Sequence, residues 1–381
     1  MNDSWQSSLA RWIEAGVVDA ALAARIRAWE AEHSAGARKS RLALISYGLG
    51  GLLLIAGVML FVAAHWDDLS PAGRFALVLA MIAVTHAGGA FAVRSSAGLS
   101  ATLHAVGTGA LGAGIYLAGQ IFNIAEHWPG ALMLWSFGAA AGVLLLRQWP
   151  QVLWLALLAP AWLWGEWMGV QIREMYGRGM KPAAVGLLLL ACTYLAARST
   201  DLNVNWRRAL AWLGAVMLIP ATAMLASGIF SAWPLFGAPP EKLSMGWLIV
   251  GWTLAIALPL ALAWFLRGRD AVWLFVALAW ALVVLRVDTR VDAGKLAFNA
   301  LLAAGAAGIV LWGVTDRQRL AINVGVLGFA LSVIFFYFSS IFDKLGRSLG
   351  LIGIGVIFIG GGWLLERMRR RLVDGIGMGM P

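Results

Sequence analysis

The sequence predicts an all-α, polytopic membrane protein: a transmembrane bundle of about 12 helices behind a small N-terminal helical hairpin. Hydrophobic residues make up 61% of the chain and charged residues only 13%, and the mean hydropathy is +0.80. A soluble domain is about 25% charged. The apolar residues form continuous runs of about 20 residues, the length that crosses a bilayer as a helix. Backbone groups in lipid must pair internally, and the short alternating strands of a barrel are not seen, so helices are predicted.

The first 41 residues are expected to form a cytoplasmic hairpin followed by a basic hinge. The apolar pattern predicts one helix over 4–15, which Gly16 closes. Asp19 is predicted to cap a second helix that runs to about residue 32. A hairpin of this size cannot build a full core. Residues 1–35 are therefore expected to pack on the membrane domain or to bind a protein partner.

A transmembrane helical domain is predicted over 42–366, and a basic cytoplasmic tail over 367–381. Twelve apolar runs divide the domain, near 42–64, 73–93, 100–122, 130–146, 150–170, 182–197, 209–227, 245–266, 271–287, 295–314, 320–341 and 348–365. Ser70 and Pro71 form a helix start before the second run. The short fourth and sixth runs are the least secure as independent spans.

The net charge of +10 comes from Lys and Arg side chains that lie mainly between the apolar runs. This position predicts contact with anionic lipid headgroups rather than with nucleic acid. With twelve spans, the loops on the side of the leader hold more Lys and Arg than the loops on the other side. The bias predicts that both termini lie in the cytoplasm.

The third run contains the pattern GxGxxG at Gly107, Gly109 and Gly112. No strand precedes this pattern and no βαβ unit surrounds it, so a dinucleotide site is not expected. Small residues recur every four positions along the same run, at Ala101, Ala105, Gly109 and Ala113, and again at Ala110, Gly114 and Ala118. Small residues at this spacing let helices approach closely. The third span is therefore predicted to be flanked on more than one side.

A group of polar residues follows the first and third runs and predicts an outward-facing polar cavity. Its candidate members are His65, Asp67, Gln120, Asn123, Glu126 and His127. The alternative interpretation is structural: a solvated end of the third helix and an interfacial corner after the first.

Two further ionisable residues, His86 and Glu166, lie within apolar runs. Ionisable groups at membrane depth are costly and are often functional, although a water-filled crevice also accommodates them. No nucleophile–base pair and no HExxH or CxxC motif occurs in the chain. The sequence therefore predicts no catalytic residue, no metal site and no cofactor, and no enzymatic activity.

Several stretches resemble a known family. They are WIEAGVVDAALAARI in the leader, HWDDLSPAGR after the first run, GIYLAGQIFNI with the following LMLW, and the closing INVGVLGFALSVIFFYFSSIFDKLGRSLGLIGIGVIFIGGGWLLERMRRRL. In these stretches the chain resembles the bacterial predicted membrane proteins of domain-of-unknown-function family 2157. The chain reads Phe336-Tyr337 where the family often has Arg-Tyr, so no role of that Arg carries over. The resemblance implies a membrane fold in the bacterial inner membrane, and it implies no activity.

Two hypotheses for the function follow from these observations. In the first, the protein transports or binds a small or amphiphilic solute at the outward polar cavity. In the second, the protein is a membrane scaffold or regulator that binds a partner through residues 1–35. Twelve spans favour transport, whereas the sparse intramembrane charge does not favour ion coupling.

Overall fold

A computed structural model describes most of the chain. The described residues are 9, 12–29, 70–122, 127–171, 180–197, 205–226, 245–287, 292–336 and 359–360, together with single residues and short pieces between 46 and 64. The predicted first span, last span and basic tail therefore lie largely or wholly outside the described residues. So do the candidate site residues His65, Asp67, Asn123 and Glu126.

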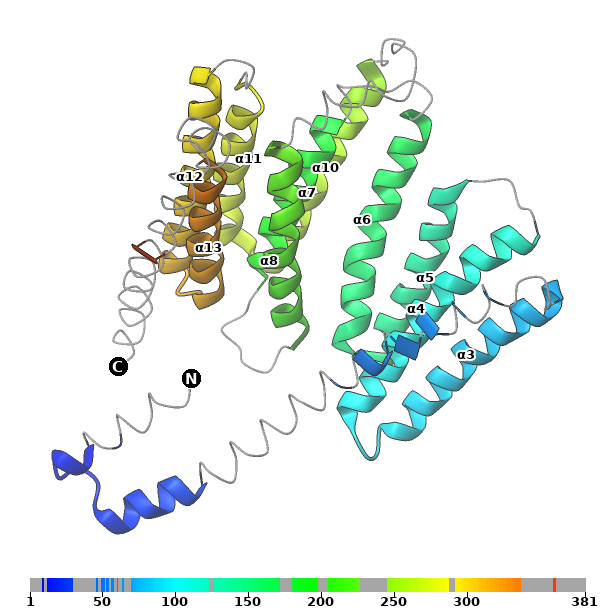
Figure 1. Ribbon diagram of the computed structural model, residues 1–381, viewed down its shortest axis with the longest axis horizontal. Coiled ribbons are helices and arrows are strands. Elements are labelled where there is room, and N and C mark those ends of the chain that lie inside the picture. Colours follow the sequence, from blue (N-terminus) through cyan, green and yellow to red (C-terminus); the bar gives the residue numbers. More distant parts are fainter. Residues whose placement is uncertain are drawn as a thin grey trace. The chain divides into compact units, whose positions relative to one another are not determined.

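The described part of the chain contains helices and no strand (Figure 1). The helices are α3 (Pro71–Ala92), α4 (Ala97–Ile121), α5 (Trp128–Leu146), α6 (Trp149–Gln171), α7 (Met180–Leu195), α8 (Asn205–Ala226), α10 (Met245–Arg267), the 3-10 turn η2 (Gly268–Val272), α11 (Trp273–Val284), α12 (Asp292–Thr315) and α13 (Arg319–Phe336). Each apolar run predicted between 73 and 341 corresponds to one of these helices. The predicted start of the second run is confirmed, because the Ser70 hydroxyl accepts a hydrogen bond from the backbone N–H of Gly73 and Pro71 opens α3.

The number of twelve spans is not confirmed. Among the described residues, seven helical stretches are long and apolar enough to cross a membrane. The predicted fourth span, α5, is among them, but α7 is too short and α6 is not among the seven. The helix α6 is long enough to span a membrane, but its tryptophans, Pro160 and Glu166 lower its mean hydropathy. The predicted eighth and ninth spans fall in one apolar stretch, Met245–Val284.

The stretch Met245–Val284 does not form one straight helix. Forty helical residues would extend about 60 Å, twice the thickness of a hydrocarbon core of about 30 Å. Gly268 divides the stretch by adopting a left-handed conformation with φ of +59°. This conformation favours glycine because a Cβ would be strained there. The 3-10 turn η2 follows Gly268 and leads into α11.

The chain divides into two compact units. The first contains Met1–Glu126 and Phe137–Gly142, and its main element is the hairpin of α3 and α4. Two other segments contact α4 closely. A Cβ on Gly51 would lie 2.6 Å from the Val106 side chain of α4, and a Cβ on Gly138 would overlap the Leu111 side chain of α4. The prediction that the third span is flanked on more than one side is therefore confirmed.

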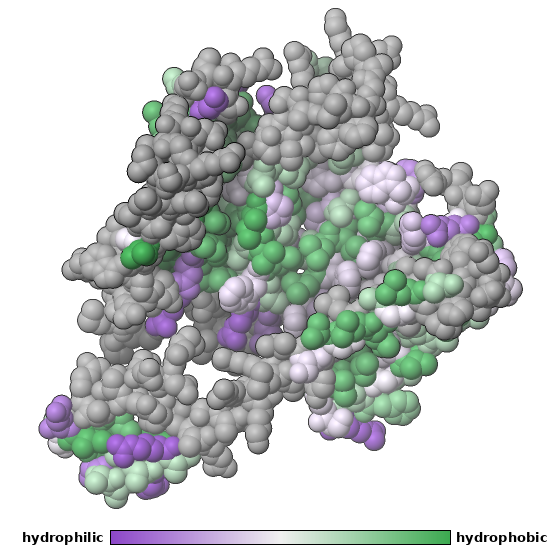
Figure 2. Space-filling model, viewed as in Figure 1, coloured by the Kyte–Doolittle hydropathy of each residue, from purple (hydrophilic) through white to green (hydrophobic). Residues whose placement is uncertain are grey.

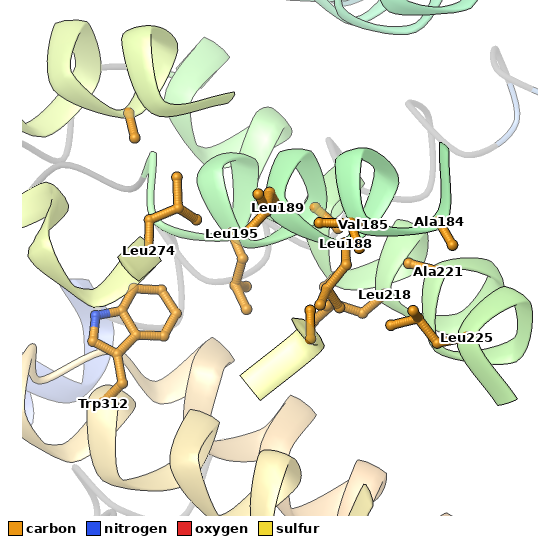
Figure 3. Packing of buried hydrophobic residues seen from close by; sticks show 14 of the residues in the cluster. Ala184, Val185, Leu188, Leu189, Leu195, Leu218, Ala221, Leu225, Leu274 and Trp312 are labelled. Carbon is orange, nitrogen blue, oxygen red and sulfur yellow. The ribbon is translucent and has the colours of Figure 1, made fainter. Parts of the chain in front are cut away.

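The second unit, His127–Ser136 and Val143–Pro381, is organised around α7. Helices α8, α10 and α11 all contact α7, and α8 contacts it most extensively. Figure 3 shows Val185, Leu188, Leu189 and Leu195 of α7 among leucines of α8 and α11 and Trp312 of α12. The sequence analysis named the sixth run, 182–197, as one of the two least secure spans. In the structure this run is α7, the most enclosed helix of its unit.

Large side chains lie over glycines at many of the helix contacts. A Cβ on Gly186 would lie 2.6 Å from the ring of Trp164, and one on Gly305 would lie 2.6 Å from Trp280. Trp167 covers Gly251 in the same way and is almost fully buried. Tryptophans therefore fill spaces between the helices of the second unit. A glycine is required wherever a ring approaches the neighbouring backbone this closely.

The outer faces of the helices are apolar. Figure 2 shows hydrophobic side chains over much of the visible helical surface, with hydrophilic residues in small separate groups. Large exposed side chains include Phe91, Leu144, Leu145 and Phe265. Exposed apolar surface on this scale is expected where a helix contacts lipid.

The described leader residues agree locally with the predicted start and stop signals. The Gly16 N–H donates to Ile13 and the Val17 N–H donates to Trp12, which is a Schellman closure, with Gly16 at φ +71°. The Asp19 carboxylate accepts from the N–H of Leu22 at 2.6 Å and caps the helix over 20–29. The pairing of the two helices as a cytoplasmic hairpin remains a prediction.

Alanine at Gly325 should destabilise the packing of α12 against α13. A Cβ there would lie 2.7 Å from Val310 Cγ2 and 2.8 Å from its backbone nitrogen, so the helices would have to separate. Overpacking of this kind costs about 1–3 kcal/mol. The thermal unfolding temperature of Gly325→Ala in detergent should therefore fall.

Gly328, in the same helix, supplies the matched control. Its Cβ would lie 3.5 Å from Ala306, an ordinary contact, so Gly328→Ala should unfold at or above the wild-type temperature. Equal effects of the two substitutions would contradict the close approach at Gly325.

Candidate functional site

The structure describes four of the eight candidate site residues. It joins His127, predicted for the outward cavity, with Glu166, singled out separately as an intramembrane acid. It joins His86 to His104, a residue that the sequence analysis did not identify. Gln120 lies exposed near the end of α4, where its amide donates to the hydroxyl of Tyr116 at 2.9 Å. Because Gln120 belongs to the first unit and His127 to the second, their convergence remains a prediction.

The first pair connects the start of α5 to the last third of α6. The Nε2 atom of His127 lies 3.0 Å and 3.2 Å from the two carboxylate oxygens of Glu166. The indole of Trp162, one turn earlier in α6, donates to the same carboxylate at 3.0 Å. The side chains remain accessible, with 67% of His127 and 38% of Glu166 exposed. A ligand can therefore reach both groups of this His–Glu site.

Local sequence places these two side chains together. His127 is the residue immediately before α5 and makes no side-chain cap to that helix, so its ring is available to α6. Gly165, next to Glu166, faces the start of α5: a Cβ there would lie 2.8 Å from Trp128 and 3.3 Å from Pro129. Only a glycine allows the beginning of α5 to approach α6 this closely. The sequence motifs HWPG and WGEW thus define one site.

One tryptophan binds the carboxylate, and others pack on the same part of α6. Trp162 donates to the carboxylate, and Trp128 covers the adjacent Gly165. Trp164 and Trp167 flank Glu166 in the sequence, but they pack over Gly186 of α7 and Gly251 of α10 and contact each other edge to face, with centroids 5.3 Å apart. Trp167 is fixed by a hydrogen bond of 2.9 Å from its indole to the carbonyl of Trp247. The arrangement offers a negative group beside aromatic surface, a combination that suits a cation with an apolar body.

The second pair lies between α3 and α4 of the first unit. The Nδ1 atoms of His86 and His104 are 3.0 Å apart, and their ring centroids are separated by 5.2 Å. His104 is buried and His86 is half-buried. A hydrogen bond between two Nδ1 atoms requires one ring to donate and the other to accept.

Each histidine of this pair occupies a space left by a glycine on the opposite helix. A Cβ on Gly107 would lie 2.6 Å from the ring of His86, and a Cβ on Gly89 would lie 2.8 Å from the ring of His104. The spacing is the same on both helices, HAGG at 86–89 and HAVG at 104–107. This repeated HAxG pattern is the signal by which the sequence could have revealed His104. Gly107, the first glycine of the GxGxxG pattern, therefore serves helix packing.

Comparison with known families covers the N-terminal part of the chain. Residues 10–152 match the model of the family described as Predicted membrane protein (DUF2157). The resemblance found in the sequence is thus confirmed over these residues, and its extension to the closing stretch remains a prediction. No curated protein and no solved structure matches the chain. The matched segment includes both histidine pair members and His127, whereas Glu166 lies beyond it.

A third polar cluster joins the ends of four helices in the second unit, and the sequence analysis did not identify it. The guanidinium of Arg267, at the end of α10, pairs with Asp316 after α12 and donates to the carbonyl of Ala196 after α7 at 3.2 Å. Arg207, near the start of α8, donates to the carbonyl of Leu266 at 3.1 Å. These contacts satisfy carbonyls that helix ends leave unpaired. The role of the cluster is therefore structural.

No group of three His, Cys, Asp or Glu side chains that could hold a metal ion occurs among the described residues. The His–Glu site and the His86–His104 pair each offer two ligand side chains. Each of these two sites can bind protons, or a ligand, through hydrogen bonds and charge.

Removal of Asp316 should destabilise the second unit strongly. The side chains of Arg267 and Asp316 are only 14% and 15% exposed, so Asp316→Ala leaves a largely buried guanidinium without its close carboxylate. Breaking such a pair costs about 3–5 kcal/mol. Chemical unfolding of the full chain in detergent should show this loss.

Asp270 provides the control because it contacts the same Arg267 side chain from a different position. Its carboxylate is 3.8 Å away and 76% exposed, so Asp270→Ala should change the unfolding free energy by no more than about 1 kcal/mol. A small effect of Asp316→Ala would show that the buried pair is not what holds these helix ends.

Proposed function

We propose that this protein binds and moves a small amphiphilic solute across the bacterial inner membrane, and that the His–Glu site receives the solute. The observation that carries the proposal is the accessible Glu166 carboxylate, which is paired with His127 and accepts a hydrogen bond from the Trp162 indole. Isolated carboxylates within apolar helices are costly and are retained mainly where they serve a ligand or ion. The favoured solute is a lipophilic cation, since it can pair with Glu166 while its apolar body contacts the tryptophans.

The proposal includes the membrane arrangement predicted from the sequence: twelve spans, both termini in the cytoplasm and the His–Glu site on the outer side. The polar cluster around Arg267 supports the predicted arrangement, in which successive helices cross the membrane in opposite directions. It brings together the ends of α7, α10 and α12 and the start of α8, all of which the charge distribution places on the cytoplasmic side.

Substitution of Glu166 by glutamine should weaken the binding of a lipophilic cation. The probe is radiolabelled tetraphenylphosphonium, and binding is measured by equilibrium dialysis with the full chain in nanodiscs. Glu166→Gln retains the size of the side chain but removes its charge, so affinity should fall about tenfold, which corresponds to about 1.4 kcal/mol. His127→Gln removes the competing partner and should leave affinity equal or higher.

Asp270→Asn is the control, because it removes an exposed carboxylate at another helix end. Affinity should be unchanged by this substitution. Equal binding by wild type and Glu166→Gln, or binding no greater than that of empty nanodiscs, would refute the solute site.

A second candidate function is a scaffold or regulator that binds a protein partner through residues 1–35. The observation that favours it is the exposure of large apolar side chains on the described helices of the leader: Trp12, Leu22 and Trp29 are 49%, 43% and 57% exposed. Exposed apolar side chains of this size commonly mark contact surfaces.

A photo-reactive amino acid placed at Trp29 in living cells tests the scaffold function. One discrete protein adduct should form at this position, because the apolar side chain is expected to enter the interface. The exposed Ala24 of the same helix serves as the control and should give little adduct. The same adducts at both positions, or none, would contradict partner binding by this surface.

A further inference from the structure

The His86–His104 pair has no part in the solute site just proposed. It belongs to the α3–α4 hairpin of the first unit, and neither His127 nor Glu166 lies on these helices. His86 is six residues before the end of α3, and His104 is seven residues after the start of α4. At 1.5 Å per residue, both rings lie about 10 Å along the helices from the α3–α4 turn. The pair is therefore inside two helices that are long and apolar enough to cross a membrane.

The packing fixes the two rings against each other. His86 fills the space above Gly107, and His104 fills the space above Gly89. The threonine hydroxyls close to the pair in the sequence bind backbone carbonyls: Thr85 donates to the carbonyl of Met81 at 2.7 Å, and Thr108 donates to the carbonyl of His104 at 3.1 Å. The polar contact that the structure gives each ring is with the other ring.

Charged groups on the elements around the pair are few and distant along the chain. On α3 the only other charged residue is Arg74, twelve positions from His86, and Arg94 follows the helix end. On α4 the only other titratable residue is Tyr116, twelve positions from His104. The segment 137–142 and the described residues between 46 and 64 contain no titratable side chain. Within the described part of the first unit, the proton balance of the pair is therefore set mainly by the two imidazoles themselves.

The contact between the two Nδ1 atoms determines the tautomers. One ring must carry its proton on Nδ1 and donate it, while the other ring carries its proton on Nε2 and accepts at Nδ1. One additional proton can bind to the free Nε2 of the donor ring, and the hydrogen bond between the rings is retained. A second additional proton must bind to the accepting Nδ1, which breaks that bond and places two positive charges side by side.

We propose that His86 and His104 form a proton-binding site within the membrane domain, in which the pair takes up one excess proton and keeps the hydrogen bond between its two Nδ1 atoms. A transition metal is disfavoured, because the nitrogens point at each other and the described residues supply no third ligand. The site lies closer to the α3–α4 turn than to the opposite helix ends, so protons enter from the turn. This inference does not depend on the solute site.

Nuclear magnetic resonance of ¹⁵N-histidine tests the site in the full chain in nanodiscs. The protein has only five histidines, so His86→Asn, His104→Asn and His127→Asn assign the signals. Metal-free wild type is measured from about pH 8.5 to about pH 4.5, a range that brackets the free imidazole value of about 6.5. At high pH, one ring of the pair should be the Nδ1–H tautomer, with a correlation between the two Nδ1 nuclei. On acidification, the pair should gain one proton jointly while this correlation persists.

Adjacent glycines provide a variant and a matched control that leave both histidines in place. Gly89→Ala introduces a Cβ 2.8 Å from the His104 ring and should abolish the Nδ1–Nδ1 correlation. Gly88→Ala introduces a Cβ 3.5 Å from Leu103, an ordinary contact, and should retain the correlation.

Three results would overturn the proposal, and all can be obtained with wild type alone. The first is a pair of Nε2–H rings with no correlation at any pH. The second is independent uptake of a full proton by each ring. The third is stoichiometric binding of added Zn²⁺ that shifts both Nδ1 signals, which would identify a metal site instead. Tetraphenylphosphonium binding does not report on this pair, so failure of either proposal leaves the other intact.

Discussion

The structure depends on close contact between helices at glycines, and at several of them a large ring from the neighbouring helix fills the space. In lipid there is no hydrophobic gain from bringing apolar helices together, so association relies on packing and on interhelical hydrogen bonds. Trp164 over Gly186, Trp167 over Gly251 and Trp280 over Gly305 supply such packing in the second unit. Two of these indoles also donate to backbone carbonyls, Trp167 to Trp247 and Trp280 to Leu301. Trp167 and Trp280 therefore combine shape with a hydrogen bond.

The same contacts create the polar sites. Gly165 lets the start of α5 approach α6, and this approach brings His127 to the Glu166 carboxylate. Gly89 and Gly107 admit the two imidazoles between α3 and α4, so the rings meet at their Nδ1 atoms. A polar group enclosed between helices must find a partner there, because lipid offers none. Glycine positions thus determine which ionisable residues become pairs.

The helical class, the start of α3 at Ser70 and the packing role of the third run were predictable from the sequence, because they depend on local composition and spacing. Pairing of His127 with Glu166 was not, since it joins residues 39 positions apart through Gly165. His104 was missed although it repeats the HAxG pattern of His86: the pattern gains meaning only when α3 and α4 run antiparallel in the right register. Hydropathy also did not reveal the central position of α7, since it measures how well a segment suits lipid and not how far other helices enclose it.

The short length of α7 has a physical explanation in its surroundings. A helix that faces lipid must match the hydrocarbon thickness, whereas α7 has 16 residues and is enclosed by α8, α10 and α11. The last carbonyls of a helix have no partner within the helix, and Arg267 donates to one of them, the carbonyl of Ala196. The charge of Arg267 is in turn balanced by Asp316. A largely buried ion pair thus lies at the end of this central helix, and it links α7 to α10 and α12.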